Sequence, residues 1–344
     1  MTTMGDVARI AGVSASTVSH VLNGTRKVNT ATRLRVEAAI EQSGYRRNGV
    51  ARSLAAGRTH TVGLSISALT NPYFNSLVHA VERALSAAGY VLIVGDSHDE
   101  LQSEKRVTDS LLDRQVDGMI VAPAAGSERL TLPDITRTGT PLVLIDRGVD
   151  IGCDQVGPEN VAPARALTEH LLELGHRRIA VLRGLAGISS TTERFDGYGA
   201  ALADHGIKVD PALVLDGASS TEVAEREVHA LMSTANRPHA LVSLNNAMTI
   251  GALKALRVLG LSIPGDVAFV CYDDFEWADL FEPRLTAAAQ DVDTIGATAV
   301  ELLLRRMHGD DAAPQHIRVP TTLHHRNSCG CTTPQPIASP TADR

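Results

Sequence analysis

Apolar residues recur at helical spacing in three short stretches near the start of the chain, and polar capping residues and glycines separate the stretches. The residues that open the stretches are Thr3, Ser14 and Thr30, and the glycines that close them are Gly12, Gly24 and Gly44. A very short turn joins the first two stretches. Two short helices joined in this way and braced by a third predict a helix-turn-helix unit over residues 1–46, which we call the head.

From residue 61 the pattern changes to short apolar runs that alternate with amphipathic stretches, as parallel strands alternate with helices. In a first round, strands are predicted at residues 62–66, 91–94, 118–121 and 142–145, and helices at residues 73–88 and 104–112. In a second round, strands are predicted at residues 179–182, 240–244 and 267–272, and helices at residues 161–174, 194–205 and 248–259. We therefore expect an α/β body of two lobes with parallel sheets over residues 61–331. The helix predicted at residues 295–307 is expected to cross back and pack on the first lobe.

Residues 47–60 join the head to the body. Val50, Ala51 and Leu54 have helical spacing there, but a helix of about two turns is too short to be stable alone in water. We expect this hinge helix to fold only on DNA and beside a second copy of the chain. At the other end of the chain, residues 332–344 are rich in Pro, Thr and Ser and are expected to be disordered.

The sequence of the head carries a family resemblance. Its run Asp-Val-Ala-x-x-Ala-Gly-Val-Ser-x-x-Thr-Val-Ser-x-Val-Leu-Asn, at residues 6–23, resembles the helix-turn-helix of the LacI/GalR transcriptional repressors. Ala-Arg-Ser-Leu at residues 51–54 resembles the hinge helix of that family. The resemblance implies an all-α head followed by a two-lobed body with the type I periplasmic-binding-protein-like fold. It also implies that paired hinge helices enter the minor groove, where Leu54 wedges between base pairs.

Contacts with DNA are expected from the second helix of the head and from the hinge. The residues expected to read bases are Ala15, Ser16 and His20, and those expected to contact phosphates are Thr17, Ser19 and Asn23. The hinge departs from the Tyr-x-Pro-Asn that is common in the family, and the departure places Arg47 where a phosphate contact is expected. A single head buries too little surface for high specificity, so we expect a homodimer on a pseudopalindromic operator.

The distribution of charge places the nucleic acid at the head. Residues 1–60 hold nine Lys and Arg against three Asp and Glu, a balance of +6, whereas the remaining residues hold 23 against 36, a balance of −13. A basic head on an acidic body attracts the phosphate backbone to the head. No apolar run approaches the ~20 residues of a membrane span, and the N-terminus has no signal-peptide pattern. We therefore expect a cytoplasmic protein with no membrane partner.

Polar residues follow several predicted strands of the body, at the edge where ligands of open α/β sheets bind. These residues are Asn71, Tyr73, Phe74, Asp146, Arg147, Arg194, Asn245 and Asp273, and each stands where the family places effector contacts. Carboxylates, amides and guanidinium groups supply the donors and acceptors that sugar hydroxyls require, and an aromatic ring can cover an apolar sugar face.

Two positions narrow the class of effector. Arg147 stands where purine-responsive relatives carry an aromatic residue, which disfavours a stacked nucleobase. Asn246 replaces an acidic residue that is common in the family, and both features favour an anionic ligand. We therefore expect a sugar, a polyol or a sugar acid between the two lobes.

The four cysteines do not form a disulfide framework in a chain of 344 residues and are expected to be reduced thiols. Two histidines lie close to the last two cysteines in the sequence, in the order His324, His325, Cys329 and Cys331. A Cys-x-Cys pair lacks the usual spacing of a zinc knuckle. Similar Ser-Cys-Gly-Cys endings occur in the family without metal, so neither a metal nor a cofactor is expected.

The sequence thus predicts a sequence-specific DNA-binding transcriptional regulator, a repressor, controlled by a small-molecule effector. A sugar-processing α/β enzyme is one alternative, but the chain has no Gly-x-Ser-x-Gly, Walker, Gly-x-Gly-x-x-Gly or His-Glu-x-x-His motif, and catalysis is not expected. A DNA-binding protein without an effector is another alternative, but it leaves the polar residues of the body unexplained. The operator, the regulated genes, the effector's identity and the choice between induction and corepression stay open.

Overall fold

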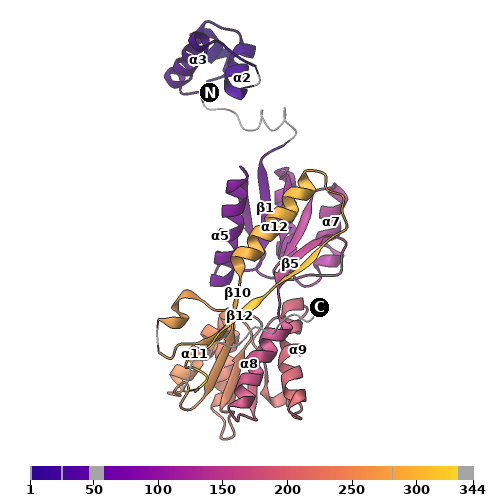
Figure 1. Ribbon diagram of the computed structural model, residues 1–344, viewed down its shortest axis with the longest axis vertical. Coiled ribbons are helices and arrows are strands. Elements are labelled where there is room, and N and C mark those ends of the chain that lie inside the picture. Colours follow the sequence, from indigo (N-terminus) through magenta and orange to yellow (C-terminus); the bar gives the residue numbers. More distant parts are fainter. Residues whose placement is uncertain (1, 25, 46–57, 281, 332–344) are drawn as a thin grey trace. The chain divides into compact units, whose positions relative to one another are not determined.

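A computed structural model describes residues 2–24, 26–45, 58–280 and 282–331 of the chain (Figure 1). Contacts divide the chain into two units, Met1–Thr59 and His60–Arg344. The predicted hinge residues Arg47 and Leu54 and the predicted disordered tail lie outside the described residues.

The first unit contains the helices α1 (Met4–Ala11), α2 (Ala15–Asn23) and α3 (Thr30–Ser43). They pack around Val7, Val18 and Val36, each with no exposed surface. The local signals act as predicted at Thr3, whose hydroxyl accepts a hydrogen bond from the Asp6 amide at 3.3 Å. The third helix begins at Thr30 as predicted, and its N-cap is Asn29, whose side-chain oxygen accepts a hydrogen bond from the Thr32 backbone amide at 2.7 Å. Asparagine is among the preferred N-cap residues, so the helix begins directly after it.

The first lobe of the body has a six-stranded sheet in the order β11-β5-β4-β3-β1-β2, in which every pair is parallel. The strands are β1 (Thr61–Ile66), β2 (Val91–Asp96), β3 (Gly118–Val121), β4 (Leu142–Ile145), β5 (Asp154–Pro158) and β11 (His316–Val319). The helices are α5 (Pro72–Ala87), α6 (Leu101–Asp113), η1 (Ser127–Arg129), α7 (Thr131–Thr138) and α12 (Val292–Met307). As predicted, α12 crosses back and packs on this lobe against α5 and β4.

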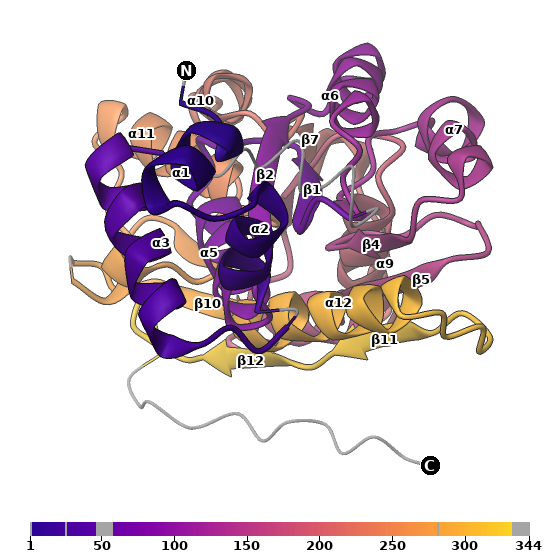
Figure 2. The ribbon, with the colours of Figure 1, turned by 90° about the horizontal axis from the view of Figure 1, so that it is seen from above.

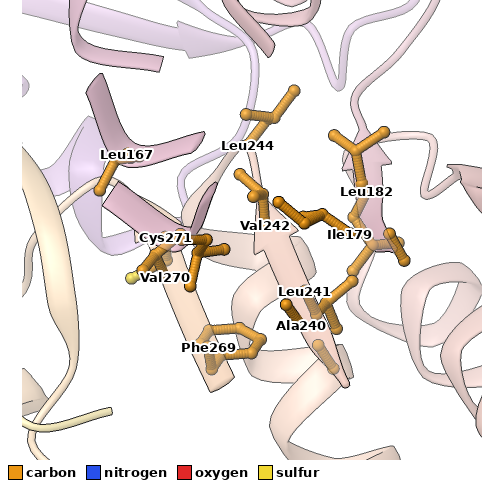
Figure 3. Packing of buried hydrophobic residues seen from close by; sticks show 14 of the residues in the cluster. Leu167, Ile179, Leu182, Ala240, Leu241, Val242, Leu244, Phe269, Val270 and Cys271 are labelled. Atoms are coloured by element: carbon orange, nitrogen blue, oxygen red, sulfur yellow. The ribbon is translucent and has the colours of Figure 1, made fainter. Parts of the chain in front are cut away.

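The second lobe repeats this plan with the order β12-β10-β9-β8-β6-β7. The strands are β6 (Ile179–Arg183), β7 (Val214–Asp216), β8 (Ala240–Ser243), β9 (Ala268–Tyr272), β10 (Thr286–Gln290) and β12 (Thr321–His324). The helices are α8 (Val161–Glu173), α9 (Ser189–Asp204), η2 (Pro211–Leu213), α10 (Thr221–Met232), α11 (Asn246–Val258) and η3 (Glu276–Asp279). Figure 3 shows part of the hydrophobic core of this lobe, where Ile179, Val242 and Phe269 are buried. These residues have almost no exposed surface because helices cover both faces of the parallel sheet.

These two lobes and the three-helix head confirm the predicted fold class, with one departure from parallel pairing. The edge strand β12 runs antiparallel to β10, because it follows β11 directly and enters the second lobe from the first. Figure 2 shows β11 and β12 as consecutive parts of one yellow ribbon. The chain also passes between the lobes at residues 158–161 and 290–292. The passage at residues 158–161 is hydrogen-bonded to the passage between β11 and β12, because the Glu159 carbonyl accepts a hydrogen bond from the Thr321 hydroxyl at 3.0 Å. The same carbonyl also accepts a hydrogen bond from the Tyr272 hydroxyl at 2.6 Å.

Helices α8 and α9 are in close backbone contact at Gly197. A Cβ atom there would lie 2.3 Å from the Val161 carbonyl oxygen and 2.9 Å from the Arg165 amide nitrogen. The pair α10 and α11 makes the same kind of contact at Gly251, where a Cβ atom would lie 2.2 Å from the Thr221 carbonyl oxygen. Both helix pairs therefore pack backbone against backbone, which only glycine permits.

Candidate ligand cavity and DNA-reading helix

The predicted DNA-contacting residues of the head belong to α2, which begins after the tight turn at Gly12. The Ser14 hydroxyl caps this helix by accepting the Thr17 amide at 3.1 Å. Val18 points into the head's core with no exposed surface, and this fixes which face of α2 is outward. The outward residues that the structure describes are Ala15 and Ser16, which are exposed, and Thr17, Ser19 and His20, which are partly exposed. Asn23 is the last residue of the helix.

A cavity of about 530 Å³ lies between the two lobes of the body. All eight residues predicted to contact the effector line it, namely Asn71, Tyr73, Phe74, Asp146, Arg147, Arg194, Asn245 and Asp273. They come from loops and helix starts that follow β1 and β4 in the first lobe and β6, β8 and β9 in the second. Its volume is within the range of small-molecule sites, and both lobes form its walls.

In the first lobe, Asp146 follows β4 with a left-handed backbone of φ 71°. This backbone turns the carboxylate into the cavity, where one oxygen accepts the Tyr73 hydroxyl at 2.6 Å. The other oxygen accepts the Arg147 Nε at 3.2 Å. Burial and the negative charge of Asp146 raise the pKa of Tyr73 well above its ordinary value, so Tyr73 stays a neutral donor.

Arg147 is only 6% exposed and already has partners on its other two nitrogens. It donates to the Asp99 carboxylate at 2.7 Å and to the Ser67 hydroxyl at 2.6 Å. Burial by itself would lower the pKa of Arg147, but the carboxylates of Asp99 and Asp146 outweigh burial and raise it. The guanidinium is therefore charged and neutralised within the protein, which removes the reason to expect an anionic ligand beside it.

In the second lobe, Asp273 follows β9 with a left-handed backbone of φ 74°, as Asp146 follows β4. Its carboxylate accepts hydrogen bonds from the backbone amide of Asn246 at 3.0 Å and from the side-chain amide of Gln290. Arg194 lies 3.9 Å away, stacked 3.7 Å over the Tyr272 ring. Burial raises the pKa of Asp273, while Arg194 and the two amide donors oppose that rise.

Arg194 is fixed by neutral acceptors rather than by a close carboxylate. Its Nε donates to the Asn160 side-chain oxygen at 2.8 Å, and its Nη1 donates to the Leu244 carbonyl at 2.9 Å. The two asparagines of the cavity are helix N-caps. The Asn71 oxygen accepts the Tyr73 amide at 3.1 Å, and the Asn245 oxygen accepts the Met248 amide at 2.9 Å. Because the caps use carbonyl oxygens, the amide NH₂ groups are the donors available to a ligand.

The two aromatic residues differ in position. Phe74 is only 4% exposed and lies under Arg147, whose guanidinium carbon is 5.9 Å from the ring centre. Tyr73 is more exposed and meets Phe74 edge to face, with ring centres 5.1 Å apart. Tyr73 is thus the ring that a ligand can contact directly, while Phe74 supports it.

Several cavity residues were missed by the sequence reasoning. Ser67 and Asp99 follow β1 and β2, so the strand-end rule would have found both if it had been applied to every strand. Gln290 ends β10, a strand that was not predicted. Glu222 and Lys254 come from α10 and α11, and no local signal shows that these positions face the cavity.

A helix-turn-helix head and a two-lobed body with a polar cavity between its lobes define a DNA-binding transcriptional regulator controlled by a small molecule. Residues 3–48 match the family model of bacterial regulatory proteins of the lacI family. Residues 168–329 match the model of the periplasmic binding protein-like domain. None of the helices in the described part of the chain is long and apolar enough to cross a membrane.

Similar proteins extend these matches over nearly the whole chain. The HTH-type transcriptional repressor PurR of Aliivibrio fischeri strain MJ11 is 34% identical over 314 residues, covering 90% of this chain and 93% of PurR. The Ribose operon repressor of Escherichia coli K12 is 33% identical over 330 residues, covering 95% of this chain and 100% of the repressor. The Lac repressor dimer bound to operator and the anti-inducer ONPF aligns with a TM-score of 0.85 at 27% identity, over 95% of this chain and 99% of that chain. This chain belongs to the lacI family of bacterial regulatory proteins, as its sequence predicted.

Proposed function

We propose that the protein is a repressor that binds a pseudopalindromic operator as a homodimer and responds to a neutral sugar or polyol bound between its lobes. The observation that carries the proposal is the polar cavity, which is lined by Asp146 and Arg147 from the first lobe and by Arg194 and Asp273 from the second. The solved Lac repressor is a dimer on its operator, which supports the same assembly here. Because the proposed partner is chromosomal DNA, we also propose that the protein acts in the cytoplasm.

The charges that line the cavity favour a neutral ligand. The acidic residues are Asp99, Asp146, Glu222 and Asp273, and the basic residues are Arg147, Arg194 and Lys254, which gives a formal charge of −1. Arg147 is already neutralised by two carboxylates, so a sugar acid gains little from it. A neutral polyhydroxylated ligand can donate hydroxyls to the carboxylates and accept from the guanidinium groups and amides. The similarity to the Ribose operon repressor supports this class.

We further propose that the protein is not an enzyme. Its named relatives are transcriptional repressors, and the cavity residues are accounted for by ligand binding. Mass spectrometry of each binding sugar after prolonged incubation with the protein tests this point. Conversion of a bound sugar into a product would overturn it.

A thermal-shift screen of the full-length protein tests the class of effector. The panel contains neutral sugars, polyols, sugar acids, sugar phosphates and purines. A ligand at 100 times its Kd is expected to add about 2.7 kcal/mol to the free energy of unfolding, because it binds only the folded state. Operator affinity is then measured with and without each stabilising compound. A stabilising purine or sugar acid with no response to neutral sugars would contradict the proposed class, and no change in operator affinity would contradict control by the ligand.

The His20→Ala variant tests which face of α2 reads bases. Removing the imidazole is expected to weaken binding to the cognate operator by on the order of 1–3 kcal/mol and to change binding to random DNA little. Fluorescence anisotropy on both DNA sequences at fixed salt measures the two losses.

Ser19→Ala is the matched control on the same helix, because Ser19 is expected to contact a phosphate. Its loss is expected to be equal on the operator and on random DNA, since phosphate contacts carry no base information. An equal loss for His20→Ala on both sequences would show that His20 is a backbone contact.

A further inference from the structure

Four side chains of the second lobe bring their donor atoms together away from the ligand cavity. They are His170, His325, Cys329 and Cys331, and one donor atom from each lies within 4.8 Å of all the others. Cys329 is 1% exposed, and the other three are partly buried. The cluster joins α8, near the start of the lobe, to the segment that follows β12.

The fold positions these residues by two separate devices. His170 occupies the last turn of α8. The other three follow β12 in a turn that closes when the Gly330 amide donates to the Asn327 carbonyl at 3.1 Å. Gly330 has φ +85°, which reverses the chain and places the sulfurs of Cys329 and Cys331 on the same side. Ser328 anchors the turn to β9, because its hydroxyl donates to the Phe269 carbonyl at 2.6 Å.

The distances between the donor atoms are close to the edges of a small tetrahedron. The two sulfurs are 3.0 Å apart, and the two Nε2 atoms of His170 and His325 are 2.7 Å apart. The His325 Nε2 lies 3.6 Å from the Cys329 sulfur and 3.3 Å from the Cys331 sulfur. Zinc–sulfur bonds of ~2.3 Å and zinc–nitrogen bonds of ~2.0 Å give tetrahedral edges of roughly 3.3–3.8 Å, so a small outward movement seats the ion.

Hydrogen bonding alone does not account for this arrangement. A neutral imidazole nitrogen makes one hydrogen bond, as a donor or as an acceptor. The His325 Nε2 nevertheless faces three groups at once, the His170 Nε2 and both sulfurs. A cation at the centre gives each of the four donor atoms a partner. Two thiolates and one divalent ion also sum to zero charge, which suits the buried position of Cys329.

We propose that this cluster binds one Zn²⁺ with His170 Nε2, His325 Nε2, Cys329 Sγ and Cys331 Sγ as its ligands. Two nitrogens and two thiolates in tetrahedral array are the ligand set typical of zinc. Four protein ligands leave no open position for substrate, so the ion is structural. It fastens α8 to the segment after β12 and stabilises the second lobe.

In the sequence, His324 stands next to His325, Cys329 and Cys331, and no metal was expected there because a Cys-x-Cys pair lacks the usual spacing of a zinc knuckle. In the structure the His324 Nδ1 lies 2.6 Å from the Asp274 carboxylate, and His170 takes its place. His170 is 155 residues before His325, so no local spacing reveals it.

Metal analysis of the untagged full-length protein, purified without chelator and in the presence of a thiol reductant, tests the proposal. We expect about one zinc per chain after dialysis, because a closed four-ligand site holds its ion tightly. His170→Gln and Cys331→Ser are expected to lose most of that zinc. The matched controls are His324→Gln and Cys153→Ser, which remove a neighbouring histidine and a distant cysteine and are expected to keep it.

Two measurements on the wild-type protein keep the test decisive if a variant does not fold. Replacing zinc by Co²⁺ is expected to give the intense visible bands of a tetrahedral site and sulfur-to-cobalt charge transfer. Adding a chelator is expected to lower the Tm of the wild-type protein but not that of metal-free His170→Gln. The absence of zinc in the reduced protein, an octahedral cobalt spectrum, or a Cys329–Cys331 disulfide in protein purified without oxygen would overturn the site. These outcomes are independent of effector and operator binding.

Discussion

Replacing Asp273 by asparagine is expected to weaken effector binding by about 2–3 kcal/mol, or roughly 30- to 150-fold, because a charged hydrogen-bond acceptor is lost. Asparagine fits the site, since the buried Gln290 Oε1 has no hydrogen-bond partner among the described residues. Rotation of the Gln290 amide would let that oxygen accept from the new NH₂ group, while the Asn246 amide keeps its acceptor. The variant should therefore fold normally and lose only the charge.

Operator affinity without effector is expected to stay unchanged in Asp273→Asn, because Asp273 lies in the body's cavity and not in the head. Titration of operator with and without the effector, over a range of effector concentrations, measures both properties. Asp216→Asn is the matched control, since Asp216 also ends a strand of the second lobe but does not line the cavity. If Asp273→Asn responds to effector at the same concentration as Asp216→Asn, the cavity is not the effector site.

The Gly197→Ala substitution is expected to lower the free energy of unfolding by about 3 kcal/mol or more, because overpacking a rigid contact forces the backbone apart. The added methyl carbon would stand 2.3 Å from the Val161 carbonyl oxygen and would have to separate α8 from α9. Backbone atoms cannot move aside as a flexible side chain can. Urea unfolding followed by circular dichroism measures the change.

Gly199→Ala is the matched control two residues further along α9. Its methyl carbon would have the Val209 side chain 3.9 Å away, which is an ordinary contact. Alanine is the better helix former, so this variant is expected to gain about 0.5–1 kcal/mol. Equal effects of the two substitutions would mean that helix propensity, and not the close approach of α8 and α9, determines stability at Gly197.

Elements with strong local signals were predictable from the sequence, and elements that depend on distant partners were not. The buried strand β4 is a run of four apolar residues, and it was found at its observed bounds. Strand β5 has the sequence Asp-Gln-Val-Gly-Pro and was missed, because it is held by pairing with β4 and β11 rather than by its own apolar content. Helix α10 was also missed, although its buried residues Ala224, Val228 and Met232 recur at helical spacing.

The candidate sites divide in the same way. All eight residues predicted from the ends of strands line one cavity, because parallel strands present their carboxyl ends at a common edge of the sheet. This pattern of strand ends could not show that Arg147 is already paired with Asp99 and Ser67, since those partners come from other loops. That pairing changes the favoured ligand from an anion to a neutral molecule. His170 of the proposed zinc site was missed for the same reason, because it lies 155 residues from His325 in the sequence.

The left-handed backbones of Asp146 and Asp273 bear on how the specificity of such a regulator could be redesigned. Glycine, asparagine and aspartate adopt this backbone most easily, and most other residues pay roughly 1–2 kcal/mol, so random substitutions at either position would mostly destabilise the fold. Glu222 and Lys254 line the same cavity from α10 and α11, where almost every side chain is sterically allowed. A library that fixes the two aspartates and varies these helical positions should therefore retain folding while it samples new ligands.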